Sequence, residues 1–191
     1  MPTSGPVMVL LDDDQMFTRF VVRCFGRVDV GVSVVVAQTS SEYRRVLHQL
    51  AGGRAPVVMI MTDRHHQEYA GEDDHAFAVA VPRDAAPGGI QLRAARRLLV
   101  SGGGGAGWAA VEALGGRCYD KPVPISDLVE QLRESAVSLA RAARAELRKD
   151  RLADYIRGEV CFGPREIVQD SMRELLWLAK KAEAAIPKLG N

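Results

Sequence analysis

The chain of 191 residues has a formal net charge of +1, and its 47% of apolar residues is typical of a globular protein. No apolar run is long enough to cross a membrane, and the first residues lack the basic segment and apolar core of a signal peptide. The balanced charge gives no indication of a nucleic-acid partner. The three cysteines are odd in number and lack metal-ligand spacing, which fits reduced thiols. We therefore expect a cytoplasmic chain without a membrane segment.

An apolar run at 7–11 leads directly into Asp12, Asp13 and Asp14. Such a run predicts a strand buried on both faces, as in parallel sheets. Ligands of these sheets lie beyond the carboxyl ends of the strands, so the acids indicate a site. Neighbouring carboxylates need a neutralising cation, and Mg²⁺ is the natural occupant of an all-oxygen cluster. The alternative is an acidic helix N-terminus, because Asp favours the N-cap and the first turn.

Helices and strands then alternate with short connections. Apolar spacing predicts a helix from Gln15 that ends at Gly26, followed by a valine-rich strand at 32–37. Thr39 is a suitable N-cap for a second helix, and a third apolar strand at 57–61 again precedes an acid. The order strand, helix, strand, helix, strand is typical of a parallel α/β domain.

The second half continues the pattern after a long insertion at 64–89. We predict, in chain order, a short helix at 90–96, a strand at 98–100, a helix at 106–114, a short strand at 117–119 and a long helix from Ser126 to about Ile156. Together with the first half, this order predicts an α/β fold with a doubly wound, five-stranded parallel sheet.

The C-terminal segment predicts another helix. Its apolar residues recur at alternating spacings of four and three, which is the seam of a helical hairpin or coiled coil: Val168, Met172, Leu175, Ala179, Ala182 and Ile186. The presence of Met172 and Trp177 raises the alternative of a ligand pocket, but packing is favoured at this spacing. We expect an α/β domain at 1–135 and a helical extension at 136–191. The extension shows no basic recognition helix, so no DNA-binding domain is evident.

Polar residues follow the predicted strands. Because the carboxyl ends of parallel strands share one edge, the sheet brings together Asp12, Asp13, Asp63, Ser101 and Lys121. Carboxylates hold Mg²⁺, while a lysine and a hydroxyl contact the oxygens of a phosphoryl group. The Asp63 carboxylate is suited to act as a nucleophile and to form an acyl phosphate.

This ordered set resembles the receiver domain of two-component response regulators over about residues 6–135. The motifs that carry the resemblance are Leu11-Asp12-Asp13-Asp14, Thr62-Asp63, Val100-Ser101-Gly102 and Asp120-Lys121-Pro122. The resemblance implies a flavodoxin-like receiver fold with Asp63 as the phosphoacceptor. It further implies Mg²⁺ held by Asp12, Asp13, Asp63 and the backbone carbonyl of His65.

The same resemblance assigns roles to the residues after the later strands. It implies Ser101 as the switch hydroxyl, Lys121 as the phosphoryl-contacting lysine, and a cis peptide bond before Pro122. The chain departs from the family at Cys118, where an aromatic residue is usual, and Tyr119 is expected to point to the other face. The insertion at 64–89 also lengthens the loop that follows the phosphoacceptor.

The expected function is therefore signalling, not enzymatic catalysis. A histidine kinase or histidine phosphotransfer protein would phosphorylate Asp63 and so change partner binding or self-association, with a homodimer formed through the C-terminal helices. The alternative is a phosphorylation-independent adaptor that keeps the receiver fold for binding alone.

Two further readings compete with signalling. In a haloacid-dehalogenase-type phosphatase, Asp12 would be the nucleophile and Asp14 the acid/base, but the late acidic pair of that family is missing and Asp63 is left unexplained. The second reading is a metal site in the insertion, formed by His65, His66 and His75 with neighbouring acids. A solvated loop is favoured there, because nothing places two histidines on one helix face.

Overall fold

The computed structural model describes residues 5–51, 55–63, 96–101, 117–148 and 165–189. The helices and strands in these ranges are, in chain order, β1 (Val7–Leu11), α1 (Gln15–Val28), β2 (Ser33–Ala37), α2 (Ser40–Ala51), β3 (Val57–Asp63), β4 (Arg96–Ser101), β5 (Arg117–Asp120), α6 (Ile125–Arg148) and α8 (Arg165–Leu189). Within the described ranges, no helix combines the length and the apolar character that a membrane span requires. The helix predicted at 106–114, the whole insertion at 64–89 and residues 90–95 of the predicted short helix lie outside the described residues. Arg96 itself begins β4, so the predicted short helix does not reach that residue.

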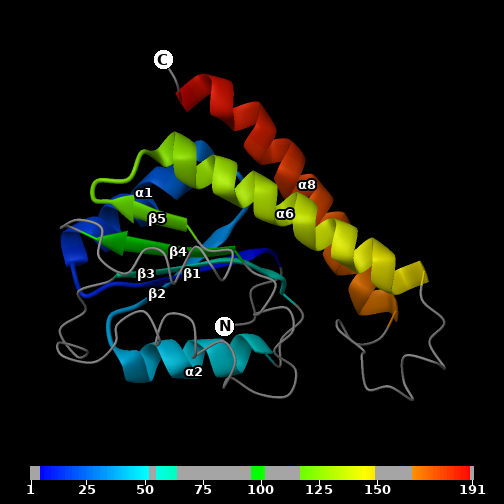
Figure 1. The fold of residues 1–191 in the computed structure, drawn as a ribbon, viewed down its shortest axis with the longest axis horizontal. Helices are drawn as coiled ribbons and strands as arrows, with labels where there is room; N and C mark the ends of the chain where they lie inside the picture. Colours follow the sequence, from blue (N-terminus) through cyan, green and yellow to red (C-terminus); the bar gives the residue numbers. More distant parts are fainter. Residues whose placement is uncertain (1–4, 52–54, 64–95, 102–116, 149–164, 190–191) are drawn as a thin grey trace.

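The strands form one parallel sheet in the order β2-β1-β3-β4-β5. Helices α1 and α6 cover one face of this sheet, and α2 covers the other (Figure 1). The expected doubly wound, five-stranded parallel sheet is therefore confirmed. Because β1 lies between two strands and beneath helices on both faces, all five of its residues are buried.

Side chains of β1 alternate between two apolar cores. Met8 and Leu10 belong to the core beneath α1 and α6, while Val9 and Leu11 belong to the core beneath α2. Tyr43 of α2 is fully buried in the second core. The continuous apolar run of the sequence thus reflects burial on both faces of the sheet.

A bulge in β3 helps to fix α6 on the sheet. The register with β1 shifts at this point, so Val58 is left without a β1 partner, and both Val58 and Met59 face the core beneath α1 and α6. The buried hydroxyl of Ser135 on α6 donates a hydrogen bond to the carbonyl oxygen of Val58. The helix therefore satisfies a backbone acceptor at the bulge, which would otherwise be costly to bury.

Helix α1 is longer than the sequence predicts. It passes Gly26 and ends at Val28, whereas an end at Gly26 was expected. A glycine inside a helix costs only about 1 kcal/mol, and Val28 recovers part of this by packing against the core. The helix ends where Asp29 adopts a left-handed conformation with a φ of 48°, and its N–H donates to the carbonyl of Phe25 at 3.3 Å.

The predicted N-cap of the second helix is confirmed. The N–H of Glu42 donates to Oγ1 of Thr39 at 3.1 Å, and the Glu42 carboxylate accepts from the N–H of Gln38 at 2.9 Å. These two bonds satisfy backbone donors at the start of α2, much as a capping box does.

Helices α6 and α8 pack side by side as an antiparallel hairpin (Figure 1). Helix α6 runs without a break through the predicted domain boundary at 135–136. The seam of α8 is buried within the same chain, with Val168, Leu175 and Ala182 essentially inaccessible to solvent. The interpretation of the seam as packing is therefore confirmed, and its partner is α6.

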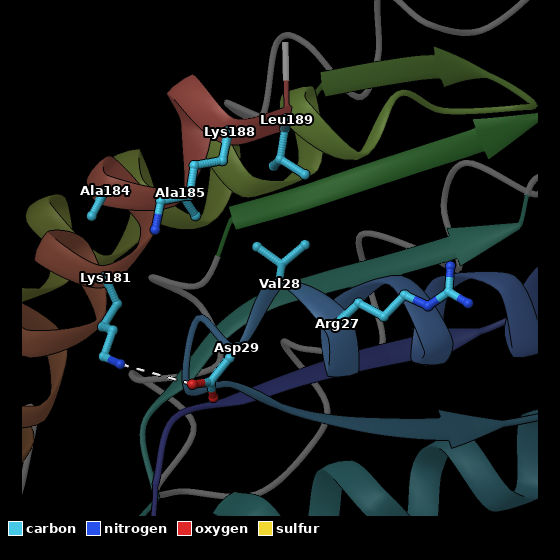
Figure 2. Close-up of a pocket in the computed structure, with 8 residues that line it drawn as sticks. All are labelled: Arg27, Val28, Asp29, Lys181, Ala184, Ala185, Lys188 and Leu189. Carbon is cyan, nitrogen blue, oxygen red and sulfur yellow. Dashed lines mark ion pairs between the residues drawn. The ribbon is translucent and has the colours of Figure 1, made fainter. Parts of the chain in front are cut away.

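Helix α8 also contacts the turn between α1 and β2. The ring of Trp177 lies directly over Gly31, where an added Cβ would come within 2.1 Å of the indole. Lys181 lies 5.3 Å from the centroid of the Trp177 ring, and its Nζ is 3.9 Å from Oδ2 of Asp29. Beside this contact, a pocket of about 540 Å³ separates the C-terminal ends of α1 and α8 (Figure 2).

The substitution Gly31→Ala tests this contact. Gly31 has a φ of +77°, and the new methyl group would meet the Trp177 ring. We expect a loss of at least about 2 kcal/mol in the free energy of unfolding, measured by urea denaturation. The control Gly26→Ala lies in α1 with open space around the new Cβ, so we expect a gain of about 1 kcal/mol. Equal effects at both positions would contradict this packing.

Candidate functional site

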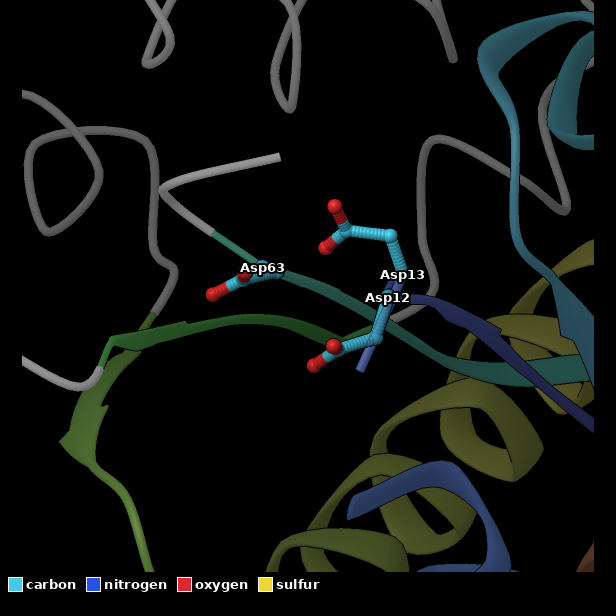
Figure 3. A group of neighbouring side chains, drawn as sticks. All are labelled: Asp12, Asp13 and Asp63. Atoms are coloured by element: carbon cyan, nitrogen blue, oxygen red, sulfur yellow. The ribbon is translucent and has the colours of Figure 1, made fainter. Parts of the chain in front are cut away.

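Three carboxylates meet at the carboxyl edge of the sheet. Asp12 and Asp13 follow β1, and Asp63 ends β3, the neighbouring strand. Figure 3 shows these side chains gathered at the ends of the two strands. One carboxylate oxygen from each residue lies within 4.8 Å of the others. The sheet therefore brings together acids that are about 50 residues apart in the sequence.

Lys121, which follows β5, joins two of these acids. Its Nζ lies 2.8 Å from Oδ2 of Asp12 and 3.3 Å from Oδ1 of Asp63. The lysine side chain is 16% exposed, so the ammonium is largely shielded from solvent. The Lys121–Pro122 peptide bond is cis, as the family resemblance implies.

Asp12 is held rigidly by the backbone around it. Its backbone N–H continues the sheet by donating to the carbonyl of Ala37 at 3.1 Å, and its Oδ1 accepts the N–H of Asp14 at 2.9 Å. The residue has no exposed surface. One carboxylate oxygen is thus committed to the loop, while Oδ2 faces Lys121.

Asp14 has a different role from its two neighbours. Its Oδ1 accepts the N–H groups of Met16 at 2.8 Å and Phe17 at 3.2 Å, which makes Asp14 the N-cap of α1. The alternative of a helix N-terminus is therefore confirmed for Asp14, while Asp12 and Asp13 lie at the carboxyl edge of the sheet beside Asp63. A side chain engaged in capping gives no support to the phosphatase alternative, which needs Asp14 as its acid/base.

Burial and charge shift the pKa values of the ion pair in the same direction. Burial raises the pKa of the Asp12 carboxyl above its ordinary 3.8, although the hydrogen-bonding contact with Lys121 opposes the shift. Burial lowers the pKa of Lys121, but the contact and charge of Asp12, together with Asp63, outweigh it and leave this pKa above 10.5. The lysine is therefore charged at neutral pH.

The cluster has the composition of a hard-cation site. Oδ2 of Asp12 and Oδ1 of Asp63 are buried oxygens that both contact the ammonium of Lys121. The cluster has three carboxylates and one ammonium. Lys121 lies between the carboxylates of Asp12 and Asp63, and the carboxylate of Asp13 lies beside them. Divalent cations prefer such oxygen ligands and reduce the repulsion between them. The residues present therefore fit a divalent cation.

Other predicted site residues are only partly described. The backbone of Ser101 pairs with Asp120 of β5, which places Ser101 at the same edge of the sheet. The Ser101 side chain, His65 and the histidine-rich insertion lie outside the described residues. Tyr119 is half-buried and packs against the core beneath α1 and α6.

Phe17 also lies at the site, although its spacing in the sequence indicates only the apolar face of α1. The centroid of its ring lies 4.7 Å from Nζ of Lys121. The two residues are more than 100 positions apart, so no local pattern indicates their contact. The nearest signal in the sequence is the Asp14 cap, which sets Phe17 in the first turn of α1.

Comparison with solved structures identifies the fold. The chain is similar to the chemotaxis protein CheY4 of Vibrio cholerae, with a TM-score of 0.53 and 16% identity over 69% of this chain and 99% of that one. The receiver domain of a DNA-binding response regulator from Colwellia psychrerythraea 34H gives a TM-score of 0.52 and 16% identity over 67% and 98% of the two chains. The chain therefore has the receiver fold.

A third structure resembles nearly the whole chain. It is a response regulator protein from Burkholderia pseudomallei with a phosphorylated aspartic acid, a calcium ion and citrate, and it gives a TM-score of 0.50 and 17% identity over 93% of this chain and 98% of that one. No family model and no curated protein matches the sequence.

The raised pKa of Asp12 predicts the effect of removing its charge. Because the pKa of Asp12 is raised in the folded state, protonation of this carboxyl stabilises the fold. The stabilisation is fully present below pH 3.8 and is lost as the pH rises through the raised pKa. We therefore expect Asp12→Asn to increase the free energy of unfolding of the cation-free protein near neutral pH. The increase should vanish below pH 3.8 in urea titrations, while the exposed control Asp120→Asn changes little at either pH. A lower free energy of unfolding for Asp12→Asn at neutral pH would contradict the raised pKa of Asp12.

Binding of a divalent cation predicts a thermal shift. A cation at a hundred times its dissociation constant should stabilise the fold by about 2.7 kcal/mol, which differential scanning fluorimetry detects as a higher Tm. The variant Asp13→Asn removes one of the three clustered carboxylates and should lose most of this shift. An equal shift in the variant would place the cation elsewhere.

Proposed function

We propose that this chain is a response regulator receiver that accepts a phosphoryl group on Asp63. The observation that carries the proposal is the position of Lys121, whose ammonium lies between Asp12 and Asp63 at one edge of a receiver fold. A lysine beside a carboxylate nucleophile supplies positive charge where the oxygens of an incoming phosphoryl group would lie. A purely structural ion pair would need one acid, whereas this lysine contacts two.

The proposed reaction is a phosphoryl transfer to a carboxylate. An oxygen of Asp63 attacks the phosphorus atom and forms an acyl phosphate. The bond from phosphorus to the donor breaks, and its electron pair stays on the donor's nitrogen in a phosphohistidine or its oxygen in acetyl phosphate. Mg²⁺, held by Asp12, Asp13, Asp63 and the backbone carbonyl of His65, would neutralise the phosphoryl oxygens. Ser101 would donate its hydroxyl to the same group.

The proposed phosphodonor is a histidine kinase or a histidine phosphotransfer protein in the cytoplasm. Helix α1 begins beside the acidic cluster and exposes two apolar side chains one turn apart, Met16 at 83% and Phe20 at 43%. Apolar side chains at such spacing suit contact with a helical partner. A donor seated there would bring its phosphohistidine towards Asp63.

The C-terminal helices are proposed to carry the response. Helix α6 begins at Ile125, four residues after Lys121, and the buried Val123 ties the connection to the core. A change in the partners of Lys121 on phosphorylation would therefore act on the start of α6, and through it on α8. The proposed output is a change in self-association or in partner binding. The alternative is an adaptor that never carries a phosphoryl group.

Intact-mass measurement tests phosphorylation. We expect a mass gain of one phosphoryl group when the protein is mixed with acetyl phosphate and Mg²⁺, and no gain in Asp63→Asn. Asp14→Asn is a matched control, because Asn also caps helices and α1 should remain intact. This variant should be phosphorylated at the same rate as the original chain. No mass gain would favour the adaptor, and a gain retained in Asp63→Asn would exclude Asp63 as the acceptor.

The same phosphorylated sample tests the response. Sedimentation velocity should show a different distribution of oligomers after phosphorylation, and the difference should disappear in Asp63→Asn. An unchanged distribution in a fully phosphorylated sample would rule out self-association as the output and leave partner binding.

A further inference from the structure

A buried aromatic ring lies against Lys121 on the side of α1. The Nζ of Lys121 is 4.7 Å from the centroid of Phe17, which is within the range of a cation–π contact. Phe17 is only 7% exposed, and its backbone N–H is bonded to the Asp14 cap. Core packing on one side and the cap on the other therefore fix the ring beside the ammonium.

A bound divalent cation would compete with Lys121 for the carboxylates that the lysine contacts. Asp12 and Asp63 form ion pairs with Lys121, and both also belong to the group of three carboxylates that fits a divalent cation. A bound cation would draw on the same carboxylates. The ring of Phe17 offers no oxygen to a hard cation, so its contact with the ammonium is not subject to this competition.

We propose that Phe17 is a positioning residue that holds the ammonium of Lys121 beside Asp63 through the face of its ring. This inference rests on the proposed phosphoryl transfer to Asp63, and Phe17 itself touches none of the reacting atoms. The electron density of the ring, and not only its volume, then sets the rate of transfer. A ring that only filled space would act through its volume alone.

The test changes the electrostatics of the ring while it keeps the shape. Phe17 is replaced in the full chain by phenylalanine with one, two or three ring fluorines, and phosphoryl gain from acetyl phosphate and Mg²⁺ is followed by intact mass. We expect the rate to fall stepwise, by roughly three- to tenfold for three fluorines. Phe17→Leu should show a similar loss of rate. Phe17→Tyr keeps the face of the ring and should retain most of the original rate.

Phe25 provides the matched control. It lies in the same core and on the same helix, eight residues or about 12 Å further along the axis, and is 3% exposed. Fluorination of Phe25 should leave the rate of transfer unchanged. A rate that does not respond to fluorination of Phe17, or that responds equally at Phe25, would overturn the positioning role.

A second measurement separates this inference from the proposed function. In NMR spectra, the ε-methylene protons of Lys121 should show an upfield ring-current shift that Phe17→Leu removes. Their order parameter should fall when Phe17 carries three fluorines. If the original chain gains no phosphoryl group, the proposed function fails, yet this measurement still decides the role of Phe17. An unchanged order parameter would then overturn it, and a fall would support it.

Discussion

The ion pair between Lys121 and the buried Asp12 is the constraint on which the site depends. A carboxylate without exposed surface is costly to ionise, and the positive charge of Lys121 at 2.8 Å offsets part of that cost. The pair requires β1 and β5 to end at the same edge, although β3 and β4 separate them in the sheet. Lys121 also lies 3.3 Å from Asp63 at the end of β3, so its ammonium bridges the two carboxylates. The polar site and the strand order are therefore mutually dependent.

The same edge is connected to the helical hairpin by the chain itself. Residues directly after Lys121 lead into α6, and the Ser135 hydroxyl binds α6 to the bulge of β3, the strand that ends in Asp63. Helix α8 packs along α6 and reaches the turn after α1 through Trp177. Helix α1 in turn carries Phe17, which contacts Lys121. A continuous set of packed elements thus joins the carboxylates to the C-terminal helices.

Burial of the α8 seam changes how self-association must be considered. The sequence offers the seam as a surface for a second copy of the chain, but α6 covers it within the same molecule. Surfaces that remain open on α8 include the half-exposed Trp177 and Leu176. Association of two copies through the hairpin would have to use such an outer face, or would require α8 to leave α6 at the cost of exposing a core.

The sequence by itself determined the strands, the order of polar residues at their ends and the hairpin seam. Apolar runs and helical spacing are local consequences of burial, and they can be read from neighbouring residues. Only the tertiary structure decided which member of the acidic run faces the site. Asp12 and Asp13 meet Asp63, while Asp14 caps α1, because the chain turns from strand to helix between them. The Phe17 contact and the packing of Val28 against the core likewise depend on residues distant in the sequence, which no local pattern records.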